Sequence, residues 1–78
     1  MIYCNLKVNN GNSAIYLFGA DTENITGEAI LYSSFTEPTV LKQPENEELP
    51  VSMLVKIVIK YKEELAKGNF PSRMSYGR

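Results

Sequence analysis

Inward-type apolar positions alternate with outward-type positions over residues 2–19, on either side of a turn that contains Gly11. The apolar positions of the first segment are Ile2, Cys4, Leu6 and Val8. This period of two is typical of a half-buried strand, and it resumes after the turn, over residues 13–19. Asn10-Gly11 is a pair favoured at the centre of a type I′ turn. The pattern therefore predicts a β-hairpin over residues 2–19.

The expected register decides which side chains share a face of this hairpin. With Asn10-Gly11 at its centre, residues whose numbers sum to 21 are paired. The aliphatic side chains then share one face with Cys4, and we expect that face to form the core. Three aromatic side chains share the other face, and a further strand can add a fourth. This candidate interaction face consists of Tyr3, Tyr16, Phe18 and Tyr32.

Three interpretations of the aromatic face stay open. Exposed aromatic and apolar patches often mark an interface or a binding groove. The C-terminal tail or a loop can instead cover these rings. Aromatic side chains on a sheet also stack nucleobases in some RNA-binding domains, but Lys7 is the one basic residue of this hairpin.

The rest of the chain predicts two strands, a helix and a tail. Residues 27–34 form a strand with apolar candidates on both faces, and residues 38–43 form a short strand behind a proline. Residues 50–67 alternate in part like a strand, yet the segment is too long for one. Pro50 suits a first helical position, and Gly68 suits the position just after a helix. We therefore expect a helix over 50–67, followed by a tail over 69–78.

These elements predict an α+β fold in a single domain over residues 1–78. The sheet is an antiparallel meander of three to four strands, in the order ββββα. The single C-terminal helix packs across one face of the sheet, because a helix of this length, about 27 Å, matches the length of the strands.

The composition of the chain argues against several kinds of catalytic site. The chain has 78 residues, no histidine and one cysteine. It therefore lacks the usual general base and any Cys-His pair, and Cys4 lies in the inward phase of its strand. No apolar run reaches the roughly 20 residues of a membrane span, and the N-terminus lacks the pattern of a signal peptide. We expect a cytoplasmic, non-catalytic protein with no metal and no cofactor.

The net charge of −1 divides into two blocks. Residues 1–50 carry two lysines against seven carboxylates, giving −5, and residues 51–78 carry six cations against two carboxylates, giving +4. Complementation of the helix dipole explains much of this split. The alternative function is binding of nucleic acid or another anionic ligand through the basic helix end and tail, although the acidic pI of about 5.3 argues against nucleic acid. The candidate cations are Lys60, Lys62, Lys67, Arg73 and Arg78.

The predicted helix carries more apolar residues than one buried stripe requires. Met53, Ile57 and Ile59 form the surplus and are a possible helix interface. A domain of this size also has a thin core. The sequence therefore favours a small protein-interaction module that forms a homodimer or binds another protein, with no membrane partner.

Overall fold

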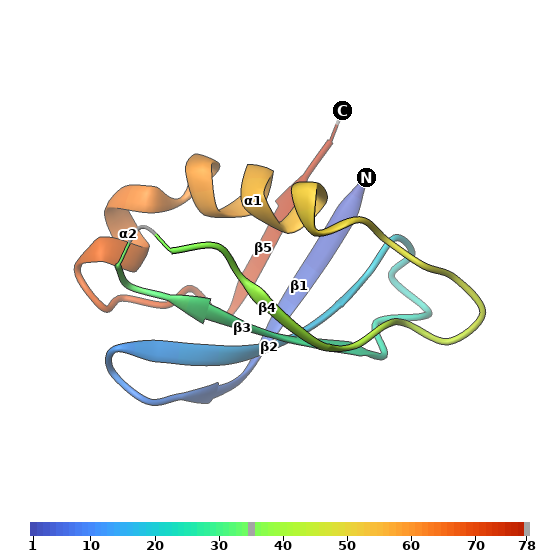
Figure 1. Ribbon diagram of the computed structural model, residues 1–78, viewed down its shortest axis with the longest axis horizontal. Coiled ribbons are helices and arrows are strands. Elements are labelled where there is room, and N and C mark those ends of the chain that lie inside the picture. Colours follow the sequence, from blue (N-terminus) through green and yellow to red (C-terminus); the bar gives the residue numbers. More distant parts are fainter. Residues whose placement is uncertain (35, 78) are drawn as a thin grey trace.

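A computed structural model describes residues 1–34 and 36–77 as one antiparallel sheet with two helices on one side (Figure 1). The strands are β1 (Ile2–Asn9), β2 (Ser13–Gly19), β3 (Gly27–Tyr32), β4 (Thr39–Lys42) and β5 (Arg73–Tyr76). The helices are α1 (Val51–Lys60) and α2 (Lys62–Ala66). The strand order is β4-β3-β2-β1-β5.

The α+β class and the antiparallel sheet are confirmed, and the number of elements differs from the prediction. Strands β1 to β4 form the expected meander, and a fifth strand from the predicted tail pairs with β1 on its free side. The predicted helix over 50–67 is two shorter helices that meet at Tyr61. The predicted strand over 27–34 ends at Tyr32, and Arg78 lies outside the described residues.

A β-bulge at Lys7 makes the predicted hairpin register wrong. Near the turn, Val8 pairs with Ile15, but Leu6 pairs with Tyr16, so Lys7 has no opposite residue on β2. An extra residue in one strand shifts the register by one and moves every later side chain to the other face. Beyond the bulge, Cys4 therefore lies opposite Phe18 instead of Leu17.

The turn also differs from the prediction, with less effect on the sheet. Gly11 has a φ of +89°, whereas Asn10 and Asn12 have no positive φ. The Asn10 amide donates to the Ser13 carbonyl at 2.8 Å. A positive φ at the first central residue alone is the arrangement of a type II′ turn, centred on Gly11-Asn12. This shift of one position at the turn keeps the faces unchanged, so the bulge alone reverses them.

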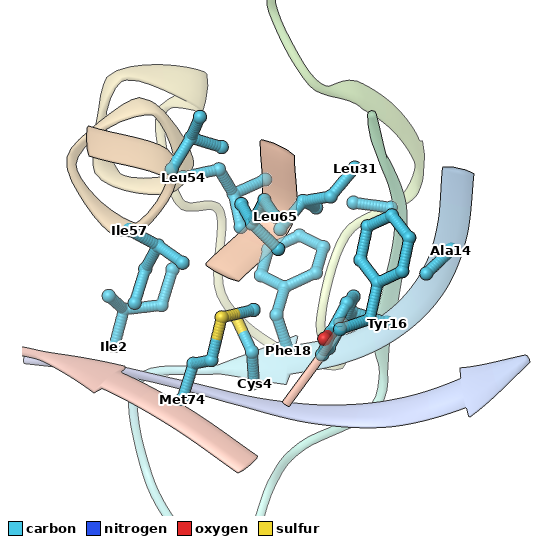
Figure 2. Packing of buried hydrophobic residues seen from close by; sticks show 13 residues of the cluster. Ile2, Cys4, Ala14, Tyr16, Phe18, Leu31, Leu54, Ile57, Leu65 and Met74 are labelled. Atoms are coloured by element: carbon cyan, nitrogen blue, oxygen red, sulfur yellow. The ribbon is translucent and has the colours of Figure 1, made fainter. Parts of the chain in front are cut away.

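The core lies between the sheet and the two helices. Tyr16 and Phe18 point into it beside Ile2, Cys4 and the side chains of the helices (Figure 2). The small side chains of Ala14 and Ala29 lie among these large ones. The helical contribution consists of Leu54, Ile57, Val58 and Leu65. Strand β2 therefore buries Tyr16 and Phe18 and turns Ile15 and Leu17 outward, the reverse of the expected arrangement. Ile2 and Cys4 of β1 lie in the core as expected.

Tyr16 connects the sheet to the segment that leads into β5. Its hydroxyl donates to the Pro71 carbonyl at 2.6 Å, and its ring lies 6.4 Å from the ring of Phe70. Offset or tilted ring pairs at this distance are favourable. The tail thus contacts Tyr16 on the helix side of the sheet, and β5 begins two residues after Pro71.

The end of α2 follows the expected stop signal. Gly68 has a φ of +77°, and its amide donates to the Leu65 carbonyl at 2.9 Å. The Asn69 amide donates to the Glu64 carbonyl at 3.0 Å. These two bonds form a Schellman motif, which reverses the chain and directs Phe70 into the core.

We expect Tyr16→Phe to lower the free energy of unfolding by about 1–2 kcal/mol, because the change leaves the Pro71 carbonyl without its donor. Tyr32→Phe is the matched control, since the Tyr32 hydroxyl bonds Thr39 at an exposed position and its loss costs about 0.5 kcal/mol or less. Urea denaturation of both variants measures the difference. Equal losses would contradict the role given to the Tyr16–Pro71 bond.

Candidate functional site on the open face of the sheet

The face of the sheet turned away from the helices carries a patch of aliphatic side chains. Val8 lies opposite Ile15, and Ile15 lies opposite Ile30, so these three form a row across β1, β2 and β3. Leu17 lies on the same face, one pair further along β2. Val8 is 40% exposed, and the other three are half-buried. We call Val8, Ile15, Leu17 and Ile30 the aliphatic patch.

One ion pair crosses the open face beside this patch. Lys7, the bulged residue, extends its ammonium group to the Glu28 carboxylate at 3.2 Å. Glu28 is the partner of Leu17 on β3, so the pair reaches across β2. It is the one salt bridge among the residues that the structure describes. A cation and an anion therefore lie side by side near the middle of the face.

The edge of the sheet at β5 is closed by side chains of the helical segment. The Lys60 ammonium donates to the Ser75 carbonyl at 2.9 Å, and the Ser75 amide donates to the Tyr61 hydroxyl at 3.3 Å. Unpaired edge groups are the usual route to pairing with another chain. The other edge strand, β4, has four residues and an irregular register against β3. The face is therefore more accessible to a partner than the edges.

The structure does not bring the four predicted aromatic residues together. Tyr16 and Phe18 are fully buried under the helices. Tyr3 and Tyr32 share the open face, but they pair with Gly19 and Ser13 at opposite ends of β2. The predicted open-face placement is therefore wrong for Tyr16 and Phe18, which the bulge at Lys7 turns into the core, and right for Tyr3 and Tyr32.

The three surplus residues of α1 do not form one surface either. Ile57 is fully buried, Met53 is half-buried against the core, and Ile59 is 52% exposed.

The candidate cations are also dispersed. Lys60 is engaged at the β5 edge, whereas Lys62 and Lys67 are exposed on α2 and at its C-terminus. Arg73 pairs with Asn5 in the sheet and belongs to the open face. Arg78 lies outside the described residues. No single surface of the described chain therefore collects this set.

Two features of the described residues bear on metal ligation and on thiol chemistry. No group of three or more His, Cys, Asp or Glu side chains among them lies close enough to hold a metal ion. Cys4 is buried, and its burial raises the pKa of the thiol to about 12. Burial, with a smaller contribution from Cys4, also raises the pKa of Tyr16. A protonated, buried thiol is a poor nucleophile.

Neither helix of the described chain has the length and apolar character that crossing a bilayer requires.

Comparisons with known proteins add no assignment. No protein-family model, no curated protein and no solved structure matches this chain. The candidate site is therefore argued from its geometry.

The raised pKa of Cys4 predicts a loss of stability in alkaline solution. Below pH 9 the thiol is protonated in both states, so it does not affect the pH dependence of folding. Above pH 9 the unfolded thiol ionises while the folded one stays neutral up to about pH 12, so stability falls by at most about 1.4 kcal/mol per pH unit. Urea midpoints at pH 8 and pH 10 measure this, with Cys4→Ala as the control whose slope is smaller. Equal slopes would contradict it.

Proposed function

We propose that the protein is a small, non-catalytic interaction module that pairs with a second copy of itself through the open face of the sheet. The observation that carries the proposal is the aliphatic patch, which lies on the face that neither helix covers (Figure 1). Removing such side chains from water is the main driving force of association, at roughly 25 cal/mol per Å².

The charges near the patch favour a second copy as the partner. A two-fold axis gives an isologous interface, in which each residue meets the counterpart of its own partner. Lys7 of one copy can then face Glu28 of the other, because both groups already lie side by side on the same face. The two additional cations of the face, Lys42 and Arg73, lie on the outer strands β4 and β5. They can remain in water at the rim.

The size of the face predicts a weak dimer. Five strands at a spacing of about 4.8 Å and about six residues of roughly 3.4 Å each give a face of about 24 by 20 Å. Two such faces bury at most roughly 1,000 Å² together, because the cations of the outer strands stay in water, and this area lies at the low end for specific interfaces. We therefore expect association in the micromolar range or weaker, with exchange between monomer and dimer.

Substitutions on the two sides of the molecule test this proposal. We expect Val8→Lys and Ile15→Thr each to weaken self-association about tenfold or more, because each removes apolar surface from the interface. Ile59→Lys is the matched control, since Ile59 is an exposed aliphatic residue on the helix side. Sedimentation equilibrium from 5 µM to 1 mM measures the constants. A wild-type protein that stays monomeric throughout, or a larger effect of Ile59→Lys, would overturn the proposal.

A charge exchange tests the two-fold arrangement directly. Lys7→Glu places two carboxylates on the face, and Glu28→Lys places two ammonium groups there. Exposed pairs of this kind contribute about 1 kcal/mol or less to folding, so both variants should fold. We expect each variant alone to be monomeric and their equimolar mixture to associate, measured by sedimentation velocity. A mixture that associates no better than the separate variants would contradict the pairing of Lys7 with Glu28 across the axis.

A further inference from the structure

A polar hollow on the open side lies where β1 and β5 meet the loop after β2. It has a volume of about 440 Å³, within the usual range for small-ligand pockets. Tyr3 and Asn5 contribute from β1, Arg73 and Ser75 from β5, and Thr22 and Ile25 from the loop. We call this hollow the Arg73 groove.

The loop wall of the groove is fixed by its own hydrogen bonds. The Asn24 side-chain amide donates to the Glu45 carbonyl at 2.7 Å and to the Glu47 carboxylate at 3.2 Å. The Asn24 backbone amide donates to the Asp21 carbonyl at 3.0 Å. The loop also lies directly against the end of β2, where a Cβ at Gly19 would meet the carbonyl oxygen of Asn24. The groove is therefore formed in advance, which lowers the entropic cost of binding.

The polar side chains that line the groove are rich in donors. The Arg73 guanidinium carries five N–H groups, and the Asn5 amide and the hydroxyls of Tyr3, Thr22 and Ser75 add further donors. No carboxylate lines the groove, and Arg73 has no salt bridge within the described chain. Asp21 and Glu23 are exposed neighbours of Thr22, and the Asp21 carboxylate accepts a hydrogen bond from the Glu23 amide at 2.9 Å.

The charge and the walls of the groove define the class of ligand. One guanidinium matches one negative charge, and its planar fork matches a carboxylate in bidentate geometry. A phosphate dianion would have one charge unmatched. The side chain of Ile25 and the rings of Tyr3 and Tyr61 supply apolar walls. We propose that the Arg73 groove binds a monocarboxylate with an apolar or aromatic body, either a free small acid or the C-terminal carboxylate of a peptide.

A titration with matched ligands tests this proposal. We use benzoate as the free acid, N-acetylphenylalanine as the peptide terminus, and benzamide and inorganic phosphate as controls. We expect one or both carboxylates to shift the backbone amide signals of Asn5, Arg73 and Ser75 in ¹⁵N-correlated NMR spectra. We expect the affinity for benzamide to be lower than that for benzoate by about tenfold or more, because benzamide lacks the charge-assisted bond. The stronger of the two carboxylates identifies the source.

The variants separate the groove from general electrostatics. We expect Arg73→Gln to weaken carboxylate binding about tenfold or more and Lys67→Gln, which removes an exposed cation elsewhere, to leave it unchanged. Arg73→Lys should retain only part of the affinity, because it keeps the charge and loses the fork. Equal losses in the Gln variants, tighter binding of phosphate, or no shifts with either carboxylate would overturn the proposal.

The carboxylate site does not depend on the proposed self-association, and one further variant distinguishes the two. The same titration is repeated with Val8→Lys, whose substitution lies outside the groove. We expect unchanged carboxylate binding in this variant. Loss of binding there would show that the groove depends on the dimer and would contradict a site formed within one chain.

Discussion

The bulge at Lys7 is the constraint on which most of this structure depends. A strand whose side chains alternate without interruption keeps one set of positions on one face, and a single extra residue exchanges the two sets. Here the exchange occurs between Leu6 and Val8. It turns the aromatic side chains of β2 toward the helices and leaves Ile15 and Leu17 on the open face. The bulged residue itself then provides the ammonium group of the ion pair with Glu28.

Burial of Tyr16 has consequences at the other end of the chain. Its hydroxyl needs a partner once it leaves water, and the Pro71 carbonyl provides one. That bond, with the ring of Phe70 beside it, places the following residues along β1, where they pair as β5. The new edge is closed in turn by Lys60 and Tyr61. A local irregularity in β1 is thus linked to the strand that completes the sheet.

The sequence predicted the elements better than it predicted their register. The alternation, Pro50 and Gly68 placed the four meander strands and the helical segment within a few residues of their observed bounds. A bulge has no dependable residue signature, so the side chains of β2 and Val8 were assigned to the wrong faces, whereas Ile2 and Cys4 of β1 lie in the core as expected. A signal for the correct assignment is Ala14, in phase with Tyr16 and Phe18, since small residues between large ones suit a packed core. Strand β5 was missed because four residues are too few for a periodic pattern.

The open face combines two kinds of surface that favour different kinds of partner. Its middle is aliphatic and carries one charge of each sign, which suits a large, flat and self-complementary contact. Its end at β1 and β5 is concave, rich in donors and positively charged, which suits a small anion. The two regions are contiguous because Leu17, Asn5 and Arg73 lie in one row across β2, β1 and β5. Arg73 lies on the outer strand β5, so a ligand held there leaves the aliphatic middle of the face free for a second copy, and the two binding events are independent of each other.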